Sequence, residues 1–369
     1  MATPAVQTHR KKRHPIVPKI QGYSHEEFDK PIVEKHPPCE IPTARHFPGL
    51  SIKGLPSLFT ETDCRTAIMS YATSTCCVGT DPAREMDITA LYPKHVHYYD
   101  LITFGETRST CLRFVPHREK RPLDGANQGV PPSPWEIPCS PIYMNTRHEL
   151  RSPVPHTTRV QACDVCAARG SVPCSVCEGS GYRRCKSCGG LGVTLEEVEY
   201  GEEEEVAEVA CESCRRKCIL RCKSCYGSGQ ETCRTCKGHR AVRTFVELRV
   251  NYRCERDSFM DNPSPVPEDD IFICEGSEIF IQEDFPVAPI TTYSVEAMNK
   301  ASISLVTKHN DAYPGGKILK QVQSMWVIPV TEVHYTWREF PHRLWVYGNS
   351  RNVYAPDYPQ QCCMGCKLM

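Results

Sequence analysis

Residues 163–236 set the architecture of this chain and read CDVCAARGSVPCSVCEGSGYRRCKSCGGLGVTLEEVEYGEEEEVAEVACESCRRKCILRCKSCYGSGQETCRTC. They contain six C-x-x-C pairs, which are Cys163/Cys166, Cys174/Cys177, Cys185/Cys188, Cys211/Cys214, Cys222/Cys225 and Cys233/Cys236. Within each trio of pairs the first cysteines are 11 residues apart, and the second trio repeats the first 48 residues later. Such a register indicates a repeated unit built on cysteine.

The spacing of the pairs is typical of zinc ligands. Two C-x-x-C pairs supply the four thiolates of a tetrahedral zinc site. The twelve cysteines therefore predict three zinc ions per chain. The alternative, a thioredoxin-like redox dithiol, normally has one such motif in a βαβ setting, so six copies in register argue against it.

Equal steps on both arms allow the pairs to meet as a nested hairpin. In that arrangement 163/166 meets 233/236, 174/177 meets 222/225, and 185/188 meets 211/214. Sequential pairing, with 163/166 beside 174/177, is the alternative, and we favour nesting. The segment between the trios alternates around Tyr200-Gly201 and predicts two short strands that close the hairpin.

Four of the six pairs are followed by glycine two residues after the second cysteine. Glycine accepts positive φ and suits a tight turn around sulfur. The pairs ending at Cys166 and Cys214 lack this glycine, so we expect them to be looser. Cys218 is an additional thiol that is either spare or a competing ligand.

Composition and the chain start favour an intracellular protein. The segment MATPAVQTHRKKRH has no apolar core of a signal peptide, and no uncharged apolar run approaches the roughly 18 residues of a membrane span. In a reducing compartment, 24 cysteines indicate metal binding rather than disulfides. The 44 basic and 44 acidic residues balance, so bulk charge points to neither nucleic acid nor membrane.

Along the chain we predict five segments: a disordered proline-rich tail (1–57), a helix plus β-hairpin part with a connector (58–160), the cysteine-rich zinc region (161–240), a β-rich part (241–350) and a C-terminal tail (351–369). The economical fold class is α+β, mostly β, in which a β-rich domain carries the hairpin-like ladder of four-cysteine zinc sites as an insertion. The basic run His9–His14 is either solvated tail or a nuclear-import signal.

Periodicity places individual elements. Thr60-x-x-Asp63 resembles a capping box, and Cys64, Ile68 and Ala72 follow at helical spacing. Val96–Thr103 and Ser109–Val115 predict a hairpin around Gly105, with Arg108 at the surface beside the turn. Residues 241–254 alternate as a half-buried strand. Further strands are predicted at 271–274, 278–282, 301–307, 322–328, 330–337 and 344–348, the last two as a second hairpin. His95, His97, His334 and His342 are interpreted as ordinary sheet residues.

The repeated C-x-x-C-x-G-x-G motif resembles the cysteine-rich region of DnaJ-type co-chaperones, most closely in CSVCEGSG, CKSCGGLG and CKSCYGSG. The chain departs from that pattern by having six pairs where the family has four, and by lacking the His-Pro-Asp tripeptide of a J-domain. The layout of residues 58–350, including CCVGTDPAREM and TFGETRST, resembles the Ssu-two homologue family. That resemblance implies an architecture but no enzymatic activity, whereas the DnaJ-type region implies polypeptide partners.

Charge and motifs separate the remaining functions. Outside the acidic apex 196–208, the ladder holds 12 basic and four acidic residues, and three four-thiolate zinc centres leave a weak excess of about two positive charges. The ladder lacks the strongly basic face with stacking aromatic rings that is typical of nucleic-acid-binding proteins. A nucleic-acid-binding zinc protein with a regulatory role in the nucleus therefore ranks second, as the alternative. Closed four-thiolate sites and the lack of catalytic motifs favour a non-enzymatic, zinc-stabilised, chaperone-like protein-interaction module.

The C-terminus reads QCCMGCKLM. Cys366-Lys367-Leu368-Met369 fits a C-a-a-X farnesylation motif, although Lys367 is not aliphatic. Cys362 and Cys363 are placed for palmitoylation, which would add the second signal that stable membrane anchoring requires. The alternatives are a plain thiol-bearing tail or a metal-binding pair. We therefore expect a cytoplasmic protein that the C-terminus can tether to a membrane face.

Overall fold

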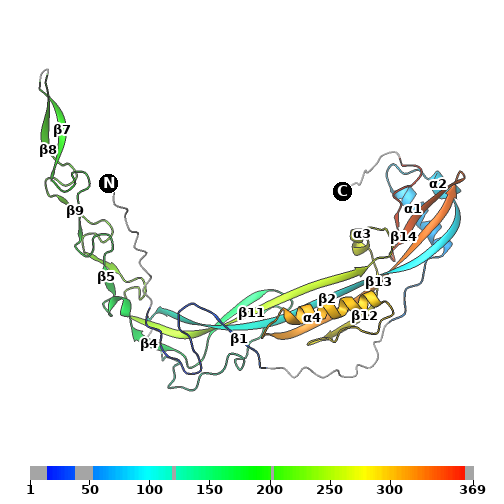
Figure 1. Ribbon diagram of the computed structural model, residues 1–369, viewed down its shortest axis with the longest axis horizontal. Helices are drawn as coiled ribbons and strands as arrows, with labels where there is room; N and C mark the ends of the chain where they lie inside the picture. Colours follow the sequence, from blue (N-terminus) through cyan, green and yellow to red (C-terminus); the bar gives the residue numbers. More distant parts are fainter. Residues whose placement is uncertain (1–14, 38–52, 119–121, 201–202, 362–369) are drawn as a thin grey trace, which may run out of the picture. The chain divides into compact units, whose positions relative to one another are not determined.

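The computed structural model describes residues 15–37, 53–118, 122–200 and 203–361, without the side chains of 196–200 and 203–207. The chain divides into two compact units (Figure 1). Unit 1 comprises 1–33, 109–138 and 151–249, and unit 2 comprises 34–108, 139–150 and 250–369. Each unit combines segments from distant parts of the sequence. The cysteine ladder lies within unit 1.

Strands dominate the structure, as predicted. They are β1 (Ile32–Glu34), β2 (Asp87–Pro116), β3 (His148–Pro153), β4 (Arg159–Ala162), β5 (Ser171–Pro173), β6 (Tyr182–Arg184), β7 (Val193–Tyr200), β8 (Glu203–Ala210), β9 (Ile219–Arg221), β10 (Gln230–Thr232), β11 (Ala241–Asp261), β12 (Ser277–Asp284), β13 (Lys317–Trp337), β14 (Phe340–Tyr347) and β15 (Asn352–Tyr354). The helices are α1 (Glu61–Ser74), α2 (Asp81–Glu85), α3 (Glu268–Ile273) and α4 (Glu296–Asp311), with a 3₁₀ turn, η1, at Asp164–Cys166.

The main sheet has the order β15-β14-β13-β2-β11-β3. In addition, β1 pairs with β2, β12 with β13, and β4 with β11. The ladder lies in sequence between β2 and β11, which are neighbours in this sheet. Its entry strand β4 pairs antiparallel with the start of β11. The ladder is therefore an insertion into a β-rich fold, as the sequence predicts.

The hairpin predicted around Gly105 is wrong, because β2 continues through that position as one strand. Gly105 pairs with Ile318 of β13. A Cβ on Gly105 would lie 2.7 Å from the Tyr313 ring, so this glycine allows close packing rather than a turn. Arg108, expected at the surface, is buried and donates from Nη2 to Glu106 Oε1 at 3.1 Å.

The second predicted hairpin is confirmed as β13 and β14. Its two turn residues, Arg338 and Glu339, have φ values of 49° and 70°, as a tight two-residue connection requires. The strands predicted at 322–328 and 330–337 form one continuous β13 that passes through Pro329. The strand predicted at 278–282 lies within β12.

Two predicted strands are helices. Residues 301–307 belong to α4, whose buried side chains include Met298, Ser302 and Val306 at a spacing of four. The β-branched residues of this segment suggested alternation, but the buried face follows the helical period. Residues 271–273 end α3, which starts with three acidic residues after Pro267. Acidic residues stabilise a helix N-terminus, which explains why this short apolar run is helical.

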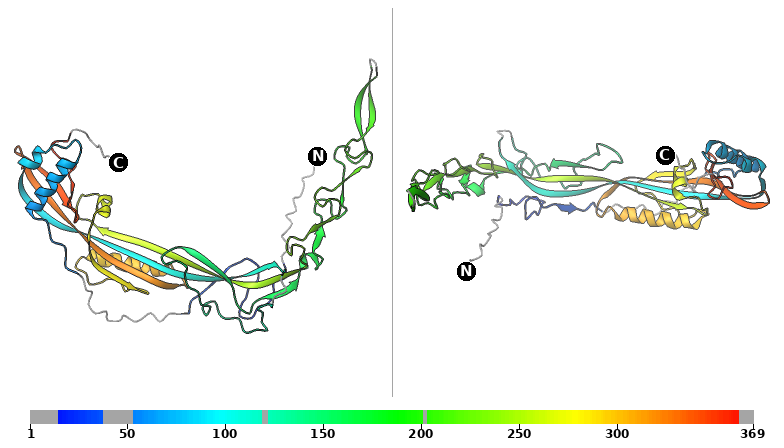
Figure 2. Two further views of the ribbon diagram at one scale, coloured as in Figure 1. Left: turned by 180° about the vertical axis from the view of Figure 1, so that it is seen from behind. Right: turned by 90° about the horizontal axis from the view of Figure 1, so that it is seen from above.

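The predicted helix is α1, and Thr60 caps it with a complete capping box. Its buried residues, Cys64, Ile68 and Ala72, pack against strands β13 and β14 in one core cluster. A second cluster packs α4 against one face of the sheet formed by β2, β12 and β13 (Figure 2). Both clusters lie in unit 2.

Residues 15–37 depart from the disordered tail predicted for residues 1–57. β1 pairs with β2, and the Asp29 N–H donates to the Leu112 carbonyl at 3.0 Å. The predicted connector also contains secondary structure, because β3 pairs with β11. Among the described residues, no helix combines the length and apolar character that crossing a membrane requires.

Candidate metal centres

The twelve predicted ligands come together in three groups of four buried thiols. Centre 1 contains Cys163, Cys166, Cys233 and Cys236; centre 2 contains Cys174, Cys177, Cys222 and Cys225; centre 3 contains Cys185, Cys188, Cys211 and Cys214. The nested arrangement is therefore confirmed, and sequential pairing is not what the chain adopts.

The distances between thiols fit zinc. Sulfurs about 2.3 Å from a tetrahedral zinc ion lie about 3.8 Å from one another. The contacts between opposite pairs measure 3.8 and 3.7 Å in centre 1, 3.8 and 3.7 Å in centre 2, and 3.8 and 3.6 Å in centre 3. A disulfide would bring two sulfurs to about 2.05 Å. The chain thus carries three sites for zinc, as expected.

Short β-ladders separate the centres within unit 1. β5 and β10 pair between centres 1 and 2, β6 and β9 pair between centres 2 and 3, and β7 and β8 pair beyond centre 3. The β7–β8 pair is the one predicted around Tyr200-Gly201. Because each rung uses equal lengths of both arms, every cysteine pair stays opposite its partner. Figure 1 shows β5, β9 and the β7–β8 pair following one another along the ladder.

Each centre is closed by a reciprocal pair of backbone hydrogen bonds. In every pair of cysteines, the N–H of the first cysteine donates to the carbonyl four residues beyond the second cysteine of the opposite pair. These bonds are Cys163 to Arg240, Cys233 to Gly170, Cys174 to Gly229, Cys222 to Gly181, Cys185 to Cys218 and Cys211 to Gly192, all at 2.9–3.0 Å. Each centre is therefore built from two equivalent halves.

A second repeated contact supports the thiolates. The backbone N–H four residues after the second cysteine donates to that cysteine's sulfur, for example from Gly181 to Cys177 at 3.2 Å. The same donors at Gly170, Gly192 and Gly229 lie 3.2–3.3 Å from their sulfurs. The backbone N–H groups of Cys218 and Arg240 bond Cys214 and Cys236 in the same way. Such bonds stabilise the charged thiolate.

No family model matches the chain. Among curated proteins, it is 35% identical to the zebrafish (Danio rerio) protein named Protein SSUH2 homolog over 343 residues, covering 92% of this chain and 87% of that protein. The human protein of the same name is 33% identical over 339 residues, covering 90% and 87%. The chain belongs to the SSUH2 homologue family. The mouse protein of that name is 30% identical over 113 residues.

In this SSUH2 homologue family member, the pairs without glycine turn in the same way as the others. Ala168 and Arg216 have φ values of 56° and 62°, where the other four pairs have glycine between 83° and 90°. The left-handed region is open to other residues at a modest cost. The expectation of looser geometry at Cys166 and Cys214 is therefore wrong.

The four thiols of a centre influence one another's ionisation. Burial raises the pKa of Cys214 to about 12, and its hydrogen bond with Cys188 acts in the same direction. Burial acts to raise the pKa of Cys188, but hydrogen bonds from the backbone N–H groups of Gly192 and Gly190 and with the Cys185 and Cys214 thiols together lower it to about 6. Neighbouring thiolates repel, so all four ionise together only around a cation. With four protein ligands, zinc has no position left for water, which suits a structural role.

The other predicted candidates fall outside the centres. Cys218 lies beside centre 3, but its sulfur faces the Arg216 carbonyl at 3.6 Å and is not among the converging thiols. Its backbone, rather than its thiol, serves the site. Sequence reasoning missed this role for Cys218 and Arg240, although their equal offset from the preceding cysteine was available as a signal. Cys362, Cys363 and Cys366 lie outside the described residues, as do residues His9–His14.

Unit 2 of this chain also contains a buried polar relay. Thr103 Oγ1 lies 2.7 Å from His309 Nδ1, and His309 Nε2 lies 2.9 Å from Asp257 Oδ2. The order resembles a catalytic relay. However, Thr103 and His309 are fully buried, and Gln321 already donates to the Thr103 hydroxyl at 2.7 Å. We interpret the relay as part of the core.

Proposed function

We propose that this protein is a zinc-stabilised, non-enzymatic interaction module, chaperone-like in action, that binds polypeptide segments along its cysteine ladder. The proposal extends the DnaJ-type resemblance of the ladder to the chemistry of its surface. The zinc centres would hold the ladder together, and the side chains between them would make the contacts.

The proposal rests on which side chains of the ladder are buried and which are exposed. All twelve thiols are buried, while large apolar side chains face solvent. The most exposed are Tyr226 at 78% and Leu191 at 75%. Others that are exposed in the ladder are Val176, Tyr182, Leu195 and Ile219. Exposed apolar residues gathered on one segment favour contact with a partner.

Backbone edges offer a second mode of contact. Among the described strands, β5 pairs only with β10, and β6 pairs only with β9. Each of these strands therefore has one edge without a partner strand. An extended polypeptide can add to such an edge through main-chain hydrogen bonds, which depend little on its sequence.

Charge adds a preference among partners. Eight Lys and Arg side chains around centres 2 and 3 are exposed, and none forms an ion pair with a described carboxylate. They are Arg183, Arg184, Lys186, Arg215, Arg216, Lys217, Arg221 and Lys223. Apolar segments flanked by acidic residues would match this combination.

A client-protection assay tests the proposal. Tyr226→Ser combined with Leu191→Ser removes the two most exposed apolar side chains without touching a ligand. We expect the double variant to keep its zinc and to lose most of the wild-type ability to suppress aggregation of a denatured client. The matched control is Val130→Ser, which removes a 70% exposed side chain of unit 1 outside the ladder. Equal protection by the double variant and the wild type would contradict the proposal.

The same eight cations, together with exposed Tyr182 and Tyr226, favour a second candidate, a nucleic-acid-binding zinc protein with a regulatory role in the nucleus. Its test is binding of single-stranded RNA and DNA at increasing salt. A steep loss of affinity with salt, and its abolition by Arg183→Glu with Arg184→Glu, would favour this candidate over polypeptide binding.

Membrane tethering through Cys366 is a separate proposal, and it rests on the C-terminal C-a-a-X motif alone. Intact-mass measurement of the protein from eukaryotic cells decides it. A prenyl mass on the C-terminal peptide is the expected result, and an unmodified full-length C-terminus would contradict it.

A further inference from the structure

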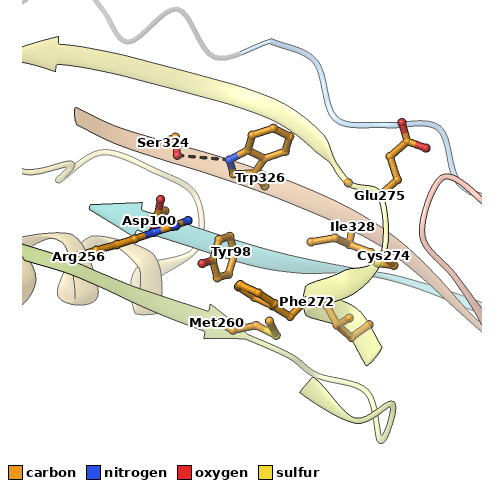
Figure 3. Close-up of a pocket in the computed structure, with 12 residues that line it drawn as sticks. Tyr98, Asp100, Arg256, Met260, Phe272, Cys274, Glu275, Ser324, Trp326 and Ile328 are labelled. Carbon is orange, nitrogen blue, oxygen red and sulfur yellow. Dashed lines mark hydrogen bonds and ion pairs between the residues drawn. The ribbon is translucent and has the colours of Figure 1, made fainter. Parts of the chain in front are cut away.

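Unit 2 contains a pocket of about 360 Å³ that the zinc ladder does not explain (Figure 3). Its floor is the sheet face opposite α4, formed by alternate residues of β2, β11 and β13. Its wall is α3 with the link to β12. We propose that this pocket binds a small carboxylic acid with an apolar tail, and that Arg256 binds the carboxylate.

The apolar part of the pocket is rich in rings. Tyr98 of β2 and Trp326 of β13 are opposite one another in the strand register. Phe272 of α3 meets Tyr98 edge to face, with ring centres 5.7 Å apart. Met260 and Ile328 complete this part of the lining. Apolar walls of this kind are typical of small-molecule sites, and the volume lies in their lower range.

Phe272 gives the pocket an apolar edge that is exposed to solvent. Its side chain is 60% exposed although it lies against Tyr98. An apolar tail lying between Phe272 and Trp326 would cover this surface. Removal of exposed apolar area from water would then contribute to binding.

The polar end of the pocket is an arginine held by a buried acid. Arg256 Nε donates to Asp100 Oδ1 at 3.0 Å. The Asp100 side chain is 9% exposed, whereas that of Arg256 is 61% exposed. Asp100 thus anchors one side of the guanidinium and leaves its outer side toward solvent. No second carboxylate pairs with Arg256 among the described residues, and a guanidinium fork matches a carboxylate in two-point geometry.

The remaining charge on the lining does not favour a cationic ligand. Glu275 turns its carboxylate away from Tyr98 and Phe272 in Figure 3, and its Oε2 accepts from Ser350 at 3.5 Å. Asp100 is both buried and paired. The group presented to an incoming ligand is therefore the guanidinium, which selects an anion.

Titration calorimetry of the full-length protein with decanoate, below its micelle concentration, tests the proposal. Methyl decanoate is the matched ligand, because it keeps the tail and removes the charge. We expect saturable single-site binding of decanoate and affinity for the ester weaker by about tenfold or more, since a hydrogen bond to a charged group is lost. Equal affinity for acid and ester, or binding of neither, would overturn the proposal.

Variants assign the binding to this pocket. Arg256→Gln should lower decanoate affinity to that of the ester and leave the ester unchanged. Because that change leaves Asp100 unpaired, Arg256→Lys provides a second variant that keeps the ion pair but removes the fork, and it should also weaken the acid selectively. Phe272→Ser should weaken both ligands. The control, Arg343→Gln, changes an exposed arginine of β14 outside the pocket and should alter neither.

Two outcomes would contradict the assignment directly. Decanoate binding that survives all three pocket variants would place the site elsewhere. Binding of a phenylalanine-terminated peptide acid without any binding of decanoate would show that the occupant is a polypeptide rather than a small acid. Neither result depends on the client-protection assay, so the two proposals can fail separately.

Discussion

At the scale of single residues, the zinc centres depend on backbone conformation as much as on thiols. In centre 2, Gly181 and Gly229 each lie close to the backbone of the opposite arm. A Cβ on Gly181 would be 2.4 Å from the Gly227 oxygen, and a Cβ on Gly229 would be 2.2 Å from the Gly179 oxygen. Gly189 is also at positive φ, but a Cβ added there would have no neighbouring atom within 4 Å, so this position needs glycine far less. Only close approach makes glycine obligatory here.

Alanine substitutions separate these two cases. Gly181→Ala should push the strands of centre 2 apart, lower the thermal unfolding temperature of the ladder and weaken zinc retention at one centre. Gly189→Ala, the control, should remain near wild type because alanine is tolerated at the equivalent Ala167. Metal analysis with thermal unfolding checks both, and equal effects of the two changes would contradict the packing argument.

Cys214 and Cys218 distinguish a ligand from a neighbouring thiol. Cys214→Ser should remove zinc from centre 3, because three thiolates and a hydroxyl bind it less well. Cys218→Ser should keep all three ions, because only the Cys218 backbone serves the site. Native mass spectrometry of the two variants measures this, and loss of zinc from Cys218→Ser would make its thiol a ligand.

The buried His97 should make the folding stability of unit 2 decrease in acid. Burial lowers the pKa of His97, the Asp261 carboxylate opposes the shift and His95 adds to it. The unfolded chain therefore takes up more protons than the folded chain as the pH falls through the range just below 6.5, and stability decreases there. His97→Gln should reduce this pH dependence in urea unfolding between about pH 7.5 and 5.5. An unchanged pH dependence in His97→Gln would contradict this account.

At the scale of elements, spacing was a reliable guide where residues repeat. The 11-residue steps led to the nested pairing, and the alternation from Val242 to Tyr252 led to β11. The predictions failed where local pattern and tertiary contact disagree. Gly105 suggests a turn in the sequence, yet in the structure the absence of a side chain there makes room for the ring of Tyr313 from a distant part of the chain. Residues 301–307 read as a strand, but their burial follows α4 against the sheet.

The rungs between the centres are too short to be stable alone. β5–β10 and β6–β9 each pair three residues, and isolated two-stranded ladders are marginal in water. Chelation should therefore unfold the ladder while the core of unit 2 persists. Limited proteolysis of chelated protein should cut first within residues 163–236, and re-addition of zinc should restore protection. Unchanged resistance after complete zinc removal would contradict a structural role for the metal.

At the scale of the whole molecule, the structure is a β-rich fold in which the ladder of three four-cysteine sites is inserted in sequence between β2 and β11. The sequence was informative about this insertion because cysteine chemistry constrains spacing. It was uninformative about the acid-binding pocket, because Asp100 and Arg256 are 156 residues apart and neither belongs to a motif. Their contact arises only from the order of strands in the sheet.

The nested set of three zinc centres is the central claim, and native mass spectrometry of paired cysteine variants tests it most directly. Cys163→Ser with Cys236→Ser damages one centre, so the chain should bind two zinc ions instead of three. Cys163→Ser with Cys174→Ser damages two centres, so it should bind one. The reverse result, with two ions lost from the first variant and one from the second, would contradict nesting and support sequential pairing.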